Sequence, residues 1–138
     1  KATRIFMSIM MTLVLFFVTS FSATAGGTDS QNGYYREANG KTYSYQTRLD
    51  VNETDASAYS TYGRNILLNI ALTVNIYYAG ENYDVDYEEY MLGKEVSVEA
   101  TNLFIDGNGV ENMADIMYAT STHRIGTFMT VDLSATVQ

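Results

Sequence analysis

The strongest constraint on the fold of this chain is a regular alternation of side chains between residues 66 and 78. From Leu68 onward every second side chain is large and apolar, and the intervening residues include Asn69, Thr73 and Asn75. An α-helix has 3.6 residues per turn and would spread these polar side chains around its circumference, whereas a strand places them on one face. The alternation therefore predicts a β-strand with one buried face and one polar face.

The same two-residue period recurs along most of the chain after residue 40. A second alternating run covers residues 83–91, and the short segment before it predicts a β-hairpin of 66–78 with 83–91. The segments 92–94 and 106–109 predict turns. Further strands are expected at 41–51, 95–101, 113–124 and 127–137, with a weaker edge strand at 56–62.

One of these runs determines the expected position of the single histidine. Within 113–124, the even-numbered residues Ala114, Ile116 and Tyr118 are expected to face the core. This phase places His123 on the polar side, at the end of a strand. Because no serine lies in a Gly-x-Ser-x-Gly motif, a serine nucleophile paired with His123 is not expected.

Six or seven such strands with turns between them are typical of an all-β domain. We predict a small antiparallel two-sheet sandwich over residues 41–138, because most strands have one apolar and one polar face. A small closed β-barrel is the alternative. Residues 26–40 are polar and rich in Gly and Asn, and they predict a flexible leader into this single domain.

Residues 1–25 have the layout of a secretory signal peptide. Lys1 and Arg4 precede an apolar run from 5 to 18, and Ala23 and Ala25 offer small side chains before Gly26. The run is shorter than the about 20 residues that a bilayer-spanning helix needs. We expect a signal helix that is cleaved before Gly26 and a secreted, extracellular protein, free or associated with the cell surface without insertion into the membrane.

Composition excludes several classes of site and partner. The chain has no Cys and one His, which excludes disulfides, thiolate metal sites and a multi-histidine metal centre. Secretion without disulfides favours a bacterial source. The chain has 16 acidic and 8 basic residues and a formal net charge of -8, which argues against binding to nucleic acid.

Three carboxylates form the main candidate for chemistry. Asp84, Asp86 and Glu88 alternate along 83–91, so their side chains would project from one face about 7 Å apart. Such a row could bind Ca²⁺ or supply two carboxylates for glycoside hydrolysis, but a solvated face that discourages strand pairing explains it more simply. Hydrolysis also needs a deep cleft, which a small domain without Trp is not expected to form. We therefore expect no catalytic residues and no cofactor, with this row as the remaining candidate for Ca²⁺.

The 12 tyrosines are the most distinctive part of the composition. Tyr has a flat apolar ring and a hydroxyl, so it suits half-wet interfaces, although it is also a common strand residue. The strand phases place six of them in the core: Tyr43, Tyr45, Tyr78, Tyr83, Tyr87 and Tyr118. The other six are expected outside the core or in loops, as a candidate interaction face: Tyr34, Tyr35, Tyr59, Tyr62, Tyr77 and Tyr90.

Two functions remain from different classes. The first is a non-catalytic structural, adhesive or protein-interaction domain at the bacterial surface, which self-associates or binds a protein partner. The alternative is a carbohydrate-binding module whose exposed tyrosines stack on the sugar rings of an extracellular glycan. An enzyme is not expected.

Overall fold

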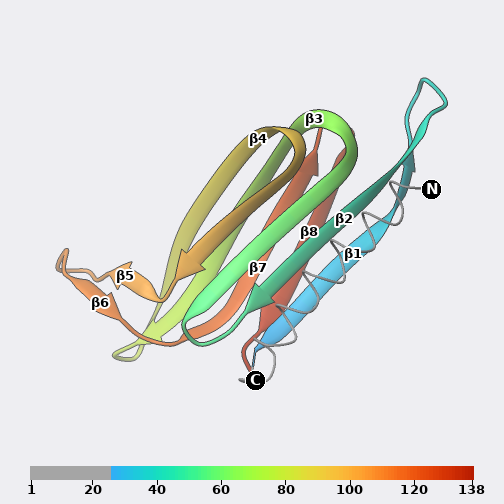
Figure 1. Cartoon of the computed structure of the whole chain (residues 1–138). Coiled ribbons are helices and arrows are strands. Elements are labelled where there is room, and N and C mark those ends of the chain that lie inside the picture. Colours follow the sequence, from blue (N-terminus) through green and yellow to red (C-terminus); the bar gives the residue numbers. More distant parts are fainter. Residues whose placement is uncertain (1–25) are drawn as a thin grey trace.

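The computed structural model describes residues 26–138, and its regular structure is antiparallel β-sheet throughout (Figure 1). The predicted signal peptide, residues 1–25, lies outside the described residues. In the described part, the structure contains no helix with the length and apolar character that a membrane crossing requires. The strands are β1 (Gly27–Arg36), β2 (Thr42–Val51), β3 (Asp55–Tyr78), β4 (Glu81–Thr101), β5 (Leu103–Ile105), β6 (Glu111–Met113), β7 (Ile116–Ile125) and β8 (Met129–Thr136).

The fold is organised around β3 and β4, which form one long hairpin that bends near its middle. The two strands pair from their open ends to the Tyr78–Glu81 turn, and the register shifts between Thr61 and Ile66. The hairpin predicted between 66–78 and 83–91 is confirmed. The turn predicted at 92–94 is wrong, because these residues continue β4 through the bend.

The segments predicted as separate strands at 56–62 and 95–101 are therefore the other halves of β3 and β4. The prediction of an edge strand at 56–62 is wrong, because this half of β3 lies between β2 and β4. The weak alternation of this segment reflects small side chains, such as Ala56 and Ala58, that face the core at its centre.

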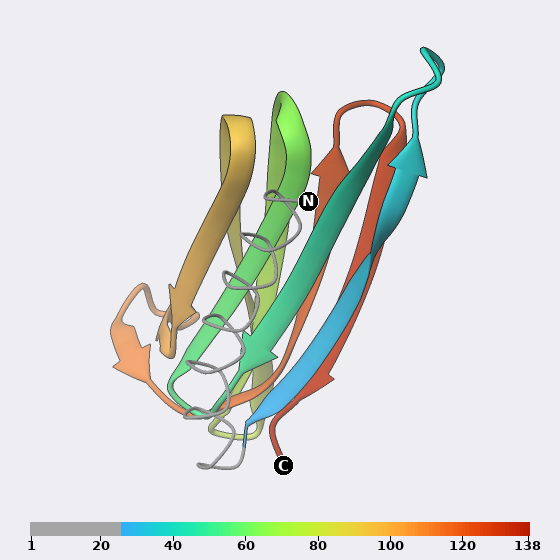
Figure 2. The ribbon, with the colours of Figure 1, turned by 45° about the vertical axis from the view of Figure 1, so that its right-hand side comes forward.

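Each half of the bent hairpin carries one four-stranded layer (Figures 1 and 2). The first layer contains β1, β2, the first half of β3 and the second half of β4. The second layer contains the first half of β4, the second half of β3, β7 and β8. The all-β antiparallel prediction is confirmed, and because β1 of the first layer approaches β8 of the second, the two layers form one nearly closed, barrel-like sheet.

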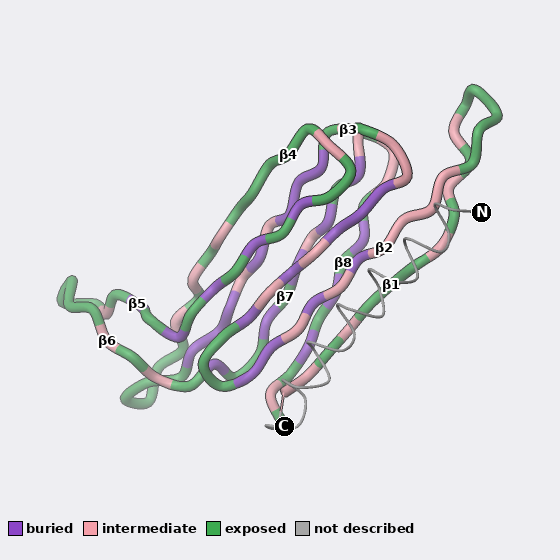
Figure 3. The backbone as a smooth tube through the Cα atoms, in the orientation of Figure 1, coloured by how far each residue is buried: buried purple, intermediate pink, exposed green. Residues whose placement is uncertain are grey.

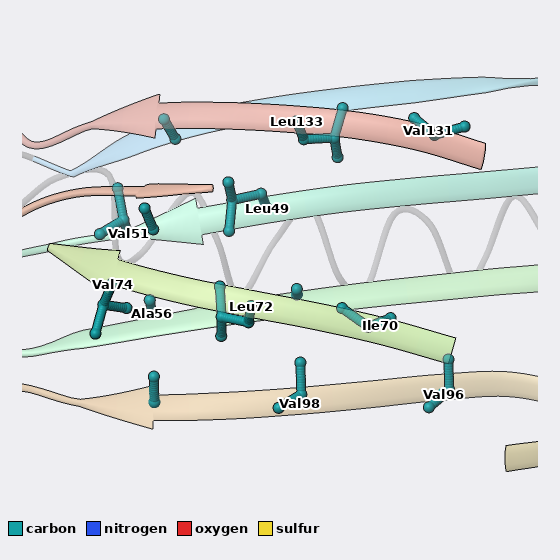
Figure 4. Close-up of a cluster of buried hydrophobic side chains, with 14 of the residues drawn as sticks. Leu49, Val51, Ala56, Ile70, Leu72, Val74, Val96, Val98, Val131 and Leu133 are labelled. Atoms are coloured by element: carbon teal, nitrogen blue, oxygen red, sulfur yellow. The ribbon is translucent and has the colours of Figure 1, made fainter. Parts of the chain in front are cut away.

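The core lies between the layers, where the inward-facing side chains of both meet (Figure 4). Leu49 of β2, Leu72 of β3 and Leu133 of β8 are all buried in this space. Burial of each such side chain stabilises the fold by about 1.5–3 kcal/mol. The inward faces of β2, of the second half of β3 and of β8 agree with the predicted alternation.

The prediction of a flexible leader at 26–40 is wrong for residues 27–36. These residues form β1 and pair with β2 along their whole length. The glycines that suggested a loop instead permit close packing. A Cβ atom at Gly27 would lie 2.2 Å from the carbonyl oxygen of Thr136 in β8, and one at Gly26 would lie 2.6 Å from the carbonyl oxygen of Val51. Only glycine lets the start of β1 approach both neighbours this closely.

β7 differs from its prediction in the residues that face the core. Ile116 pairs with Ile76 but Tyr118 pairs with Asn75, so Met117 is an extra residue that shifts the register. A bulge of this kind inverts the faces of all later residues in the strand. The buried side chains after the bulge are therefore the odd-numbered ones: Ala119, Ser121, His123 and Ile125.

Candidate interaction surface

The outer edge of β4 is a long strand edge with no strand against it in the described part of the chain. Within residues 26–138, β3 is the only strand that pairs with β4, over a strand of 21 residues. This edge lies on the opposite side of the molecule from β1 and β8, and the first half of β4 is mostly exposed (Figure 3). Strand edges without a partner carry unpaired backbone N–H and C=O groups.

The hairpin turn determines which residues direct these groups outward. Ala79 and Gly80 both have positive φ angles (53° and 85°), as in the tight two-residue turn that joins antiparallel strands. In such a turn the flanking residues, Tyr78 and Glu81, bond to each other, and bonded and non-bonded pairs then alternate along the ladder. The even-numbered residues between 82 and 92 therefore direct their N–H and C=O groups away from β3.

The outer face beside this edge carries the predicted acidic row. Asp84, Asp86 and Glu88 are exposed on one face of β4, as their spacing predicts. Each accepts a hydrogen bond from a side chain on β3: Asn75 Nδ2 to Asp84 Oδ1 (2.8 Å), Thr73 Oγ1 to Asp86 Oδ1 (2.6 Å) and Asn69 Nδ2 to Glu88 Oε1 (3.1 Å). A carboxylate has about four acceptor positions, so each retains capacity for a further donor.

The charge of this row is not neutralised by ion pairs on the described part of the protein. The salt bridges there join Arg48 to Asp50 and Arg64 to Glu37, and neither includes a residue of β4. Hydrogen bonds from Tyr90 and Asn69 lower the pKa of Glu88, and the positive charge of Arg124 lowers it further. Among the described residues, no three His, Cys, Asp or Glu side chains are grouped so that they could hold a metal ion.

The inner face beside the same edge is apolar and incompletely covered. Tyr83, Val85 and Tyr87 point between the layers, pack against the core and remain half-buried. The ring of Tyr83 lies 4.7 Å from that of Phe104 in β5. The open edge thus combines free backbone groups with an acidic outer row and an apolar inner row.

The tyrosines of the predicted interaction face do not gather on one surface. Tyr34, Tyr77 and Tyr90 are 60%, 51% and 59% exposed, on β1, at the hairpin end of β3 and on β4. Tyr35 is half-buried and stacks on Phe128 at 4.5 Å. Tyr59 is also half-buried, and burial is the main cause that raises its pKa to about 12.

Tyr62 contradicts its predicted position outside the core, because it is 1% exposed. Its ring lies 5.5 Å from that of Tyr43 and 5.8 Å from that of Phe128, on the inward face of the first half of β3. The Arg64 guanidinium lies 6.0 Å from the same ring and pairs with Glu37. The core positions predicted for Tyr78 and Tyr118 are also wrong, since these side chains are 37% and 41% exposed.

A buried polar bridge joins the two layers, and the sequence did not predict it. His123 Nδ1 lies 2.6 Å from Ser60 Oγ of β3, and His123 Nε2 lies 2.7 Å from Ser121 Oγ. Burial is the main cause that lowers the pKa of His123 to about 4, so the imidazole is neutral near pH 7. All three side chains of this bridge are buried between the layers, away from solvent.

Only one feature of the sequence could have indicated this bridge. Ser60 lies at an inward position of its strand, where a hydroxyl needs a buried partner, whereas the alternation predicted for 113–124 placed Ser121 and His123 on the polar face. The partner comes from the opposite layer, and the bulge at Met117 is what turns His123 toward it.

A second apolar region adjoins the open edge. β5 and β6 form a small ribbon in which Phe104 is buried, while its outer side chains are exposed. The exposed apolar residues of this ribbon and its turn are Leu103, Ile105, Val110 and Met113. β5 begins directly after β4, and β5 and β6 lie on the same side of the molecule as β4 (Figure 1).

Comparison of the chain with protein-family models, with curated proteins and with solved structures yields no match.

Proposed function

We propose that this chain is a secreted bacterial, non-catalytic protein-interaction domain that binds an extended segment of a partner protein along the open edge of β4. The observation that carries the proposal is that β4, a strand of 21 residues, is paired on one side only within the described residues. Export is inferred from the layout of residues 1–25, and a bacterial source from the absence of Cys.

Strand addition fits the chemistry of this edge. An added strand gains main-chain hydrogen bonds from the outward N–H and C=O groups, and alternate side chains determine its specificity. The even-numbered residues between 82 and 92 offer these groups over a continuous stretch. The acidic side chains discourage pairing with another acidic strand, but they do not cover the backbone.

The exposed tyrosines support a glycan site less well. Tyr90 pairs with Asn69 close to the bend of the hairpin, and Tyr77 pairs with Asn82 beside its turn. At about 3.3 Å per residue, the backbone positions of these two tyrosines are roughly 26 Å apart along the strand. They do not form one stacking platform for adjacent sugar rings, so we retain a protein segment as the occupant.

A matched pair of substitutions at one position tests the proposal. Peptides are selected from a displayed random library on the immobilised protein, and their affinities are then measured for the Asp86→Pro and Asp86→Ala variants. Both substitutions remove the carboxylate, but only proline also removes the outward N–H at this position. We expect Asp86→Ala to retain most of the binding and Asp86→Pro to lose it.

Circular dichroism and urea unfolding provide the control that both variants remain folded. Failure to select any binding peptide, or selection of peptides that bind folded Asp86→Pro as well as the unsubstituted protein, would contradict strand addition at β4.

A further inference from the structure

The charges along β4 restrict the kind of segment that its open edge can accept. β4 contains a single basic residue, Lys94, within a strand rich in carboxylates. Its acidic residues are Glu81, Asp84, Asp86, Glu88, Glu89, Glu95 and Glu99. The chain as a whole has a formal net charge of -8, and the positive charge of Arg124 on β7 acts on Glu88 at one end of the row.

The geometry of an added strand places its side chains directly against this row. Residues opposite each other on neighbouring antiparallel strands have Cβ atoms about 5 Å apart, where opposite charges attract and like charges repel. Asp84, Asp86 and Glu88 are exposed there and form no ion pair with a described base. Basic side chains on the added strand would meet them.

The same geometry disfavours a second copy of this chain. Pairing of two β4 edges would bring the acidic row of one copy against the acidic row of the other, which is destabilising at this separation. Charge complementarity therefore favours a basic segment from a different protein.

The apolar inner row of the β4 edge determines which side chains should alternate with the basic ones on the added strand. Successive side chains of a strand point to opposite faces, so a residue that follows one facing Asp84 or Asp86 points toward the inner face. Tyr83, Val85 and Tyr87 are half-buried apolar side chains on that face. Apolar residues on the added strand would cover them and bury surface that is now exposed to water.

We infer that the occupant of the β4 edge is an extended segment of a partner protein in which Lys or Arg alternates with apolar residues. This inference rests on the proposed function and specifies the partner of the same site. The basic side chains lie against Asp84, Asp86 and Glu88, and the apolar side chains lie against Tyr83, Val85 and Tyr87.

Three synthetic peptides with a common pattern test this charge requirement. In each, Val occupies alternate positions, and the remaining positions are all Lys, all Glu or all Thr. Binding is measured by fluorescence anisotropy at low and high salt. We expect the Lys–Val peptide to bind most tightly, and we expect its affinity to fall as the salt concentration rises. The Glu–Val peptide should show no binding.

A charge-neutralised protein and a matched control locate the effect. The Asp84→Asn, Asp86→Asn and Glu88→Gln triple variant is compared with the Glu53→Gln, Asp115→Asn and Asp132→Asn triple variant, which changes the net charge equally at exposed positions outside β4. We expect the first variant to bind the Lys–Val peptide about tenfold more weakly, and the control to differ by about twofold or less.

The outcomes separate this inference from the proposed function. Equal affinity for the Lys–Val and Thr–Val peptides, with both affinities lost in Asp86→Pro, would overturn the basic pattern and leave strand addition intact. An equal loss in the two triple variants would also overturn it, because the effect would follow net charge and not the row. If none of the peptides binds, or if binding persists in folded Asp86→Pro, the proposed function itself fails.

Discussion

The two edges of the main sheet differ in whether their backbone N–H and C=O groups are covered by a neighbouring strand. At one edge β1 meets β8: Ser134 N–H donates to Asp29 Oδ2 at 3.0 Å, and the backbone at Gly27 lies directly against Thr136. At the other edge β4 has no strand beyond it in the described residues. The first edge is closed by close packing, and the second is left open.

The difference shows two solutions to the same problem of unpaired strand edges. Closure at β1 and β8 requires glycine at a contact where any larger residue would collide, so it restricts the sequence strongly. The open edge at β4 requires only charged side chains, which keep copies apart without covering the backbone. Closure stabilises the fold, whereas the open edge remains available to a partner.

Proline substitutions at adjacent residues of β4 give the largest expected contrast between a paired and an open backbone group. Val85 directs its N–H toward β3, whereas Asp86 directs its own outward. Val85→Pro should lower the free energy of unfolding by about 3 kcal/mol or more, because a ladder bond is lost and the strands are forced apart. Asp86→Pro should cost about 1 kcal/mol, measured by urea unfolding. Equal losses would show that the edge is not open as described.

The buried bridge between Ser60, His123 and Ser121 predicts that the free energy of unfolding depends on pH, independently of both edges. The unfolded chain protonates His123 near pH 6.5, but the folded protein does so only near pH 4. As the pH falls through this window, the unfolded state binds more protons, so the free energy of unfolding should fall by about 3 kcal/mol and then level off.

The measurement is urea unfolding at a series of pH values, for the unsubstituted protein and for a His123→Leu, Ser60→Ala and Ser121→Ala variant. The variant cannot protonate at this position, and the difference between the two proteins isolates the bridge from the many carboxylates. The same slope in both proteins between pH 6.5 and pH 4 would contradict a neutral buried His123.

A pair of glycine substitutions tests the closed edge. Gly27→Ala places a Cβ atom 2.2 Å from a backbone oxygen of β8, whereas a Cβ atom at Gly107 meets no atom within 4 Å. We expect Gly27→Ala to lower the free energy of unfolding by about 2 kcal/mol and Gly107→Ala to change it by less than about 0.5 kcal/mol. Thermal or urea unfolding would reveal the difference. An insensitive Gly27 would mean that β1 and β8 are not in close contact.

Removal of one carboxylate at each edge gives the smallest expected difference in the free energy of unfolding. Asp29→Ala removes the acceptor for the Ser134 N–H and should cost about 1 kcal/mol in the free energy of unfolding. Glu99→Ala lies at an exposed position on the open edge and should change it by less than about 0.5 kcal/mol. Urea unfolding of both variants checks this, and a larger loss from Glu99→Ala would reverse the comparison.

Much of the local structure follows from the chain itself, but the candidate site does so only in part. The acidic row on one face of β4 was predictable, because two-residue spacing in a strand dictates a shared face whatever the neighbours are. That β4 forms an open edge was not predictable, since alternation along one strand contains no information about what lies beside it. Tyr62 was misplaced for a related reason: the short segment 56–62 has tyrosine on both faces, and only the pairing of β3 with β2 and β4 decides which face is buried.

The sequence by itself determined the all-β class, the hairpin of 66–78 with 83–91 and the inward faces of β2 and β8, because side-chain alternation and turn chemistry are local properties of the backbone. The tertiary structure decided the rest: that residues 27–36 form a strand, that β3 and β4 bend across both layers, and that His123 turns inward after the bulge at Met117. Each of these depends on pairing between residues far apart in the chain, where one extra residue inverts every face that follows it.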